Sequence, residues 1–404
     1  MMTHVRKITE FLGLRRSIMG LLSMVILVGM GEHMAEQFLP VYLLALGGGV
    51  ISIGFLNGMD NLLGALYAFP GGYLSERLGY KRALLIFNVM SMAGFVIVIL
   101  IPQWWAVIVG AALFLSWTAI SLPATMSMVA RVLPKDKRTM GVSVHSLVRR
   151  VPMALGPMIG GWFIVKWGTV DGVRLAFLGA LAMAVVALIA QQVLIEEEKP
   201  KDRKSAPSVR SMLSLLPRMN PSLRNLLVSD ILIRFCEQIP YAFVVVWSMK
   251  AVEGAGISAG KFGVLRAIEM ATAILIYIPV AYMADRTHKK PFVVMTFIFF
   301  TLFPLVLLFS RSFEMLLAAF VLRGLKEFGE PTRKALIMDL APEDQKAGMF
   351  GVYYLVRDVI VSIAAFGGAF LWKISPEVNL LTAFGFGAIG TAWFAVRGKD
   401  LKGE

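Results

Sequence analysis

Three titratable residues stand close together in an apolar stretch near the N-terminus. Glu32, His33 and Glu36 follow fifteen uncharged residues, 17–31, and precede the uncharged segment 41–49. An ionised side chain at the centre of a bilayer costs at least about 2.5–3.5 kcal/mol, so it is seldom kept without a partner or a function. Carboxyl and imidazole groups can also bind and release protons. The stretch therefore predicts proton or substrate chemistry inside a membrane.

Ionisable residues recur at the same depth in five other apolar stretches. Each lies about ten residues from the end of its stretch, which at about 1.5 Å per residue is near the bilayer midplane. Burial favours the neutral carboxyl and a nearby arginine favours the charged one, so a moving arginine would switch proton affinity. We expect a proton-coupling layer of two acids and one arginine from each half: Glu36, Asp60, Arg149, Glu237, Glu269 and Arg357. Alternatively, the layer only holds helices together.

Further charges are not mirrored between the halves, and we expect them to contact an asymmetric substrate. They are Glu32, His33, Asp230, Arg234, Arg323, Lys326 and Glu327. Alternatively, Arg323–Glu327 and Lys326–Glu330 form pairs four residues apart along one helix, and Arg266–Glu269 a pair three apart. One histidine and two acids on a single helix are not a metal-ligand set, so neither a metal site nor a cofactor is expected.

The elements that position these residues are long apolar segments. The chain has 404 residues, 57% hydrophobic and 16% charged, and its mean hydropathy is +0.73. Apolar stretches of about 20 residues predict transmembrane helices, whereas barrel strands are about half as long. The fold class is therefore an all-α integral membrane protein with twelve spans: 17–46, 51–73, 83–102, 104–130, 141–166, 174–196, 224–249, 258–284, 290–310, 313–340, 347–372 and 378–396.

The basic residues show how the chain is oriented. The net charge of +14 does not indicate nucleic acid, because the lysines and arginines gather in alternate loops, for example at Arg77, Lys81 and Arg82 and again at Arg333, Lys334 and Lys346. This bias places both termini in the cytoplasm. The long first apolar run lacks a cleavage site, so we expect a cell-membrane protein without a cleaved signal, which would lie in the inner membrane if the source is bacterial.

The two halves of the chain are related. Residues 122–150 align with 330–358 at an offset of 208, residues 71–82 with 280–291 at 209, and Glu36-Gln37 with Glu237-Gln238, each pair being followed by a proline. The predicted domains are an N-terminal six-helix bundle, 1–196, a cytoplasmic linker, 197–223, and a C-terminal six-helix bundle, 224–404. Two parallel halves are one architecture of secondary transporters.

The loop between the second and third spans resembles the glycine- and charge-containing loop of the major facilitator superfamily. The residues of the first copy are Gly72, Glu76, Arg77, Gly79, Lys81 and Arg82, and a degenerate second copy contains Asp285 and Arg286. The second copy lacks both glycines, so we expect it to gate less tightly. Plain positive-inside charge is the alternative reading of both loops.

The resemblance implies a transporter that works by alternating access, with spans 1, 4, 7 and 10 lining the cavity. Gly156, Pro157, Gly160 and Gly161 resemble the fifth-helix motif of the superfamily's antiporters and favour export, although ordinary small-residue packing is the alternative. Span 4 carries Ser116 and Thr118 where many proton-driven members have an arginine.

We therefore predict a monomeric, non-enzymatic transporter that couples protons to the export of a small amphipathic or charged organic compound within membrane lipids. The alternatives are an importer of an organic anion or metal chelate, bound by Arg234, Arg323 and Lys326, and a receptor on the same fold that does not transport. No nucleotide-binding loop and no nucleophile–base pair can be assembled from the sequence.

Overall fold

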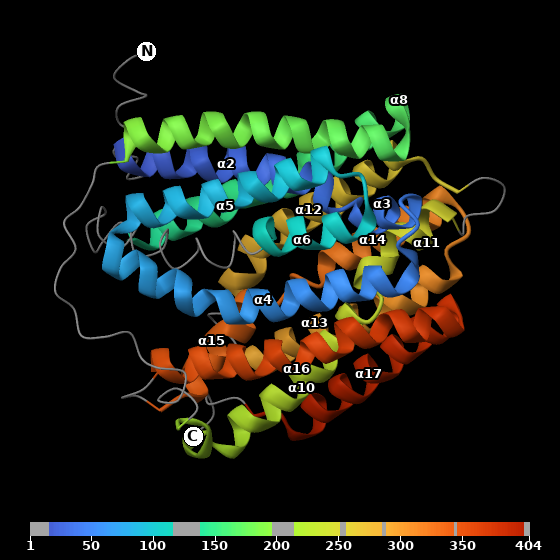
Figure 1. Ribbon diagram of the computed structural model, residues 1–404. Helices are drawn as coiled ribbons and strands as arrows, with labels where there is room; N and C mark the ends of the chain where they lie inside the picture. The colour runs from blue at the N-terminus through green and yellow to red at the C-terminus, as the bar shows by residue number, and fades with distance from the viewer. Residues whose placement is uncertain are drawn as a thin grey trace, which may run out of the picture. The chain divides into compact units, whose positions relative to one another are not determined.

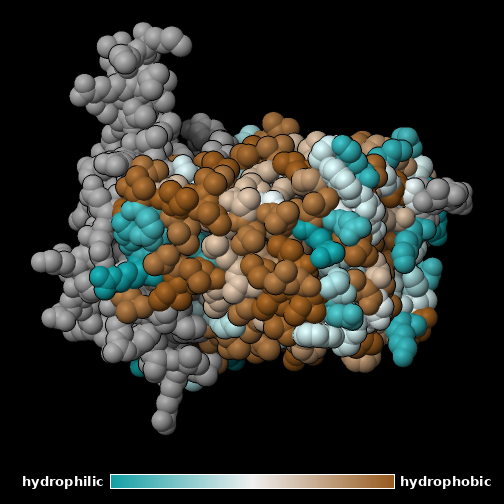
Figure 2. Space-filling view, turned by 45° about the horizontal axis from the view of Figure 1, so that its top comes forward, coloured by the Kyte–Doolittle hydropathy of each residue, from teal (hydrophilic) through white to brown (hydrophobic). Residues whose placement is uncertain are grey.

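The computed structural model describes residues 16–115, 138–195, 214–250, 256–284, 288–342 and 346–399. Within these ranges the regular structure is helical (Figure 1). Seven helical stretches of the described part are long and apolar enough to cross a membrane. Apolar side chains cover the middle of the face seen in Figure 2, while hydrophilic ones gather toward its ends. Large apolar residues such as Leu275 and Val396 are exposed, as side chains that face lipid should be.

By its contacts the chain divides into two compact units. The first comprises residues 1–47, 66–206 and 259–263. Its described helices are α2 (Arg16–Glu36), α3 (Leu39–Ala45), the end of α4 (Gly49–Leu78), α5 (Tyr80–Leu100), α6 (Trp104–Phe114), α8 (Arg138–Leu194) and the start of α12 (Ala259–Ala284). In Figure 1, α2 (dark blue) runs along α8 (green), and α5 packs against both α6 and α8.

The second unit comprises residues 48–65, 207–258 and 264–404. Besides the first part of α4 and most of α12, it contains η2 (Leu216–Arg218), α10 (Pro221–Gln238), η3 (Tyr241–Phe243), α11 (Val244–Lys250), α13 (Lys289–Phe309), α14 (Phe313–Leu325), α15 (Glu330–Leu340), α16 (Lys346–Ile374) and α17 (Pro376–Arg397). Helix α10 packs against α16 and α17, and α17 against α13. Since α4 and α12 contribute to both units, the predicted domain boundaries stay a prediction.

Prolines interrupt three of the predicted spans. The predicted helix 17–46 is two helices, because Pro40 has no N–H to donate to the carbonyl of Glu36, where α2 ends. In the same way α10 ends at Gln238 just before Pro240, and Pro331 lies in the first turn of α15, after the break at 326–329. These breaks place Glu36, Glu237 and Lys326 at or beside helix ends in the middle of a predicted span.

Two glycines with positive φ make the tight turns between long helices. Gly79, with φ of 82°, is the single residue between α4 and α5, so the predicted loop of residues 71–82 is mostly helical. Gly168, with φ of 79°, divides α8 into the two arms predicted as separate spans. Only glycine adopts this backbone conformation without a steric cost.

Small residues bring α2 and α8 into close contact. A Cβ atom at Gly160 would lie 1.8 Å from the backbone oxygen of Met34, and one at Gly156 would lie 2.8 Å from the Cβ of His33. A Cβ atom at Gly31 would meet the backbone of Ala180 at 2.8 Å. These positions therefore require glycine for the helices to approach as closely as they do.

Candidate functional site

The second unit contains a connected group of buried charged side chains, which we call the charge network. Helices α10, α12, α14, α15 and α16 all contribute to it. Its members are Asp230, Arg234, Glu237, Arg266, Glu269, Arg323, Lys326, Glu330, Arg333 and Arg357.

Asp230 is the centre of one part of the network. Arg333 donates to its Oδ2, which also lies 3.3 Å from Nη1 of Arg357 and accepts a hydrogen bond from Tyr353 at 3.1 Å. Nε of Arg234 lies 3.8 Å from its other oxygen. Asp230 and Arg333 are each 1% exposed. A buried ionised carboxylate is stable only with such partners, so this part of the network is fully ionic.

Glu237 is the centre of the second part. Arg234, one turn earlier on α10, and Lys326, which caps α14, each donate to it at 2.6 Å. Arg234 also lies 3.4 Å from Glu330, whose two oxygens accept from Arg333. The proline breaks permit this arrangement, because they bring the ends of α10 and α14 and the start of α15 together.

Glu269 of α12 is the third centre. Arg266 donates to it, Nε of Arg323 lies 3.5 Å away and Nζ of Lys326 lies 4.0 Å away. Lys326 thus joins Glu269 to Glu237, and Arg234 joins Glu237 to Asp230. The three centres therefore form one continuous network.

Positive charge exceeds negative charge in this network. It contains six cationic side chains and four carboxylates. At its edge, Lys334 contacts Glu330 and Asp358 contacts Arg357, and these two opposite charges cancel. Glu327 lies at the break between α14 and α15, and counting it as a fifth carboxylate leaves an excess of one cation among these described residues. Aromatic faces support the cations: Arg234 and Lys326 lie over Phe300, and Arg357 lies 4.2 Å from the ring centroid of Tyr354.

The first unit contains a simpler pair. Nδ1 of His33 lies 2.9 Å from Oε2 of Glu36, and the two side chains are 16% and 19% exposed. Glu32 is buried one turn before Glu36 and interacts electrostatically with Arg149 of α8. This pair joins an imidazole to a carboxylate, whereas an arginine contributes to each of the three centres of the charge network in the second unit.

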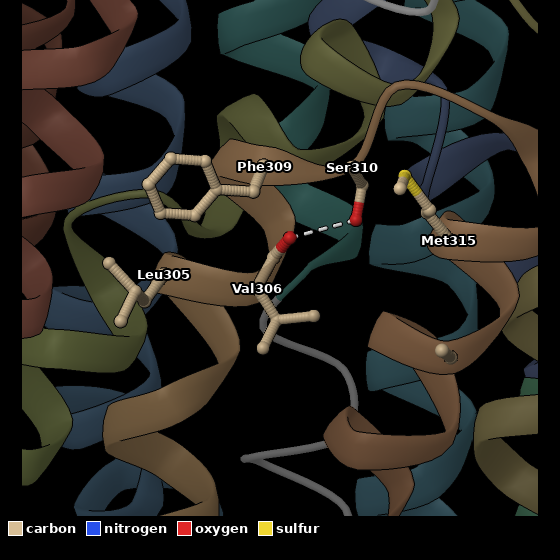
Figure 3. A pocket seen from close by; sticks show the side chains of 6 residues that line it. Leu305, Val306, Phe309, Ser310 and Met315 are labelled. Carbon is tan, nitrogen blue, oxygen red and sulfur yellow. Dashed lines mark hydrogen bonds between the residues drawn. The ribbon is translucent and has the colours of Figure 1, made fainter.

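An apolar pocket of about 300 Å³ lies between the end of α13 and the start of α14 (Figure 3). Its lining is Leu305, Val306, Phe309, Ser310, Met315 and Ala318. The hydroxyl of Ser310 donates to the carbonyl of Val306 at 2.8 Å. No charged side chain lines this pocket, so it has no means of recognising a charged substrate.

Comparison with known proteins identifies the fold and the family. A family model described as the Major Facilitator Superfamily matches residues 21–251 and 232–403, which together cover nearly the whole chain. The chain belongs to the major facilitator superfamily. It is therefore a secondary transporter and not an enzyme, and a multi-pass membrane protein.

Among its relatives, the MFS-type transporter MJ1317 of Methanocaldococcus jannaschii is 21% identical over 361 residues, which are 87% of each chain. A crystal structure of a point mutant of the nucleoside transporter NupG superposes with a TM-score of 0.82 at 10% identity, covering 95% of this chain and 100% of that one. The peptide transporter POT in complex with sulfate superposes with a TM-score of 0.76 at 16% identity, covering 95% and 93%.

The superfamily loop lies partly outside the described residues. Gly79, Lys81 and Arg82 are described, and Lys81 donates to the carbonyl of Gln192 at 2.7 Å. Gly72, Glu76 and Arg77 belong to α4, and their side chains are not described. Asp285 and Arg286 lie outside the described residues, so the role of this loop stays a prediction.

The predicted coupling residues fall into different surroundings. Glu237, Glu269 and Arg357 belong to the charge network, whereas Glu36 pairs with His33. Asp60 lies in the part of α4 that belongs to the second unit. Near it, Asn57 and Asn61 donate to the backbone and side-chain oxygens of Gln238, each at 3.1 Å. The common depth of the six residues involves both units and stays a prediction.

The predicted substrate residues Asp230, Arg234, Arg323 and Lys326 come together in the network, and Glu327 lies at the helix break beside it. The expected Lys326–Glu330 pair is wrong, because the break separates these residues and Lys326 binds Glu237 instead. Arg266 and Glu269 do form the pair expected from their spacing.

Sequence reasoning missed Arg333, which it assigned to a basic loop. The structure buries Arg333 against Asp230 and Glu330. A signal was present, since Arg333 lies within the predicted span 313–340. Within the described residues, no group of three histidine, cysteine or acidic side chains is arranged to hold a metal ion.

The fifth-helix motif lies in α8. Gly156 and Gly160 pack against α2, as described above, and a Cβ atom at Gly161 would lie 2.4 Å from the carbonyl oxygen of Ala259. Gly263 in turn packs against the backbone of Pro157. The motif thus allows α8 to contact both α2 and the start of α12 closely.

Proposed function

We propose that this superfamily member transports a small organic anion by proton-coupled alternating access, with export as the direction of transport. The excess of cations in the charge network is the observation that supports the substrate class. Every cation of the network has a carboxylate partner, and a bound anion would offset the excess of positive charge that remains. An anion is therefore favoured over a neutral or cationic compound.

The accessible part of the network suits this substrate. Arg234 is the most exposed of the charged side chains of the network, at 18%. Lys326, Glu237 and Glu330 are exposed to 11%, 10% and 13%, whereas Asp230 and Glu269 are almost completely buried. Guanidinium and ammonium groups bind carboxylate and phosphate oxygens, and Phe300 beside both cations offers an apolar surface. Together they favour an organic anion with an apolar part over an inorganic ion.

Export is supported by the glycines of α8, which resemble the antiporter motif, and proton coupling by the titratable His33–Glu36 pair. The alternative is an importer of the same anion. The charge network favours it equally, because a group of cations would bind the anion whether transport is inward or outward.

The substrate class is tested by thermal unfolding of the purified protein with mono- and dicarboxylates, phosphate esters and sulfonates, and with organic cations as the comparison. Binding to the folded state raises its melting temperature. We expect stabilisation by a subset of anions, which Arg234→Gln or Lys326→Gln abolishes and Lys334→Gln, at the exposed edge, preserves. Stabilisation by cations alone would contradict the proposal.

Transport and its direction are tested in proteoliposomes with the stabilising anion and an imposed pH gradient. We expect antiport, in which the anion leaves the compartment that protons enter. Accumulation together with protons would identify an importer. Binding without flux would identify a receptor that does not transport.

A further inference from the structure

The two halves contain equivalent acid pairs with different partners. At an offset of 201, His33 and Glu36 align with Arg234 and Glu237. Each pair is formed three residues apart in the last turn before a proline break, with distances of 2.9 Å and 2.6 Å. The fold therefore places both glutamates alike, and the difference lies in the residue one turn earlier.

The second-half glutamate is held by permanent charges. Glu237 accepts from Arg234 and from Lys326, and an arginine does not lose its proton in a protein. At the repeat offset of 208, the residue equivalent to Lys326 is Thr118, and at 201 the residue equivalent to Arg234 is His33. In this alignment a histidine and a threonine stand at the positions of the two cations that hold Glu237. A histidine side chain ordinarily changes its charge between about pH 5 and 8.

The surroundings of the pair contain other charged groups. Glu32 lies one turn away on α2, and Lys261 lies at the start of α12 in the same unit. The charged residues of α8 whose side chains are described are Arg149, Arg150, Lys166, Asp171 and Arg174. Helix α3 carries no charged residue, and the charges of α5, Lys81 and Arg82, are at its first turn. Arg149 interacts electrostatically with Glu32. Gly156 packs directly against the Cβ atom and the backbone of His33.

We infer that the His33–Glu36 pair is the proton-carrying site of this transporter, and that the Arg234–Glu237 pair is its fixed-charge counterpart. The inference rests on the proposed proton coupling. With neutral imidazole and carboxylate the pair carries one negative charge. The neutral imidazole already donates its Nδ1 proton to Oε2, so the added proton goes to the carboxyl group of Glu36. Its uptake leaves two neutral groups, and its release restores the negative charge. The partial exposure of both side chains gives that proton a route to water.

The test is His33→Arg, which converts the first-half pair into a copy of the second. An ion pair with Glu36 remains possible, but it no longer titrates. In infrared difference spectra between about pH 5 and 8, the wild-type protein should gain a carboxylic-acid band at the acidic pH. We expect His33→Arg and Glu36→Gln to lose that band and Glu237→Gln to keep it.

These spectra need no substrate, so they separate this inference from the proposed function. If anions stabilise the protein but the acid band survives in both His33→Arg and Glu36→Gln, the proton site lies elsewhere and the inference is wrong. If the band depends on His33 and Glu36 although no anion binds, the inference stands and the proposed substrate class fails.

The transport assay adds a readout that a purely structural pair would not change. In proteoliposomes that contain the stabilising anion, His33→Arg should make flux the same with and without a pH gradient. Gel filtration and the melting temperature establish that the variant is folded. A folded His33→Arg protein whose flux still responds to the gradient would overturn the inference.

Discussion

Individual side chains in the two units differ in whether their charge can change. In the second unit, Asp230 is surrounded by Arg333, Arg357 and Arg234, which keep their charge at any physiological pH. In the first unit, Glu36 is paired with an imidazole. The same residue type, a carboxylate in an apolar helix, therefore has arginine partners in one unit and an imidazole partner in the other, and we infer that only the second arrangement carries the coupling proton.

Removing the charge of Asp230 leaves its arginines buried without their shared partner. We expect Asp230→Asn to lower the free energy of unfolding by about 3–5 kcal/mol, which is typical when one member of a buried ion pair is removed. Denaturant titration of the protein in detergent measures this loss.

The matched control is Lys334→Ala. Lys334 lies 3.4 Å from Glu330 and is 48% exposed, so its removal should cost at most about 1 kcal/mol. Equal costs for the two variants would show that the network around Asp230 does not stabilise the fold.

At the scale of helices, close packing decides where the titratable pair lies. Helices α2 and α8 approach until Gly160 touches the backbone of Met34, between His33 and Glu36. Pro40 then ends α2 at Glu36 by removing a hydrogen-bond donor. Both features hold the pair against α8 at the end of a helix.

Gly160→Ala tests this packing. Its Cβ atom cannot fit 1.8 Å from a carbonyl oxygen, so α2 and α8 must separate, and we expect a loss of about 1–3 kcal/mol of stability. Differential scanning of the purified protein measures the fall in melting temperature.

Gly367→Ala is the control, because nothing lies within 4 Å of the added carbon. In a helix this change is expected to be neutral or to stabilise by up to about 1 kcal/mol. A Gly160→Ala protein as stable as Gly367→Ala would mean that α2 and α8 do not depend on the glycine.

At the scale of the whole molecule, the two halves of the sequence repeat differ in the charged residues that they carry. The acids Glu36 and Glu237 are mirrored, whereas the cations Arg234 and Lys326 are not. Since a substrate is asymmetric, a duplicated fold can bind it in one half and carry the coupling proton in the other. Alternating access would then link the two events.

This division predicts that anion binding and protonation can be abolished separately by different substitutions. Lys326→Gln should abolish the stabilisation by organic anions and retain the infrared band of the His33–Glu36 pair. Glu36→Gln should do the reverse. Thermal unfolding and infrared spectra of both variants provide the four measurements, and loss of both signals in either variant would argue against separate tasks for the halves.

The sequence by itself determined the class of this protein. Hydropathy predicts the helices because the cost of placing residues in lipid is local, and the repeat with its glycine- and charge-containing loop indicates the superfamily. The sequence also located Glu36 and Glu237, each followed by a proline. It did not predict the helix breaks at Pro40, Pro240 and Pro331, where it indicates continuous spans.

Only the tertiary structure decided which charges meet. Spacing along the chain allowed Lys326 to pair with Glu330, but the folded protein brings it to Glu237 of another helix, and it buries Arg333 against Asp230. The physical reason is that an ion pair between helices depends on which faces pack together and where a helix is broken. Neither is set by the separation of two residues in the chain.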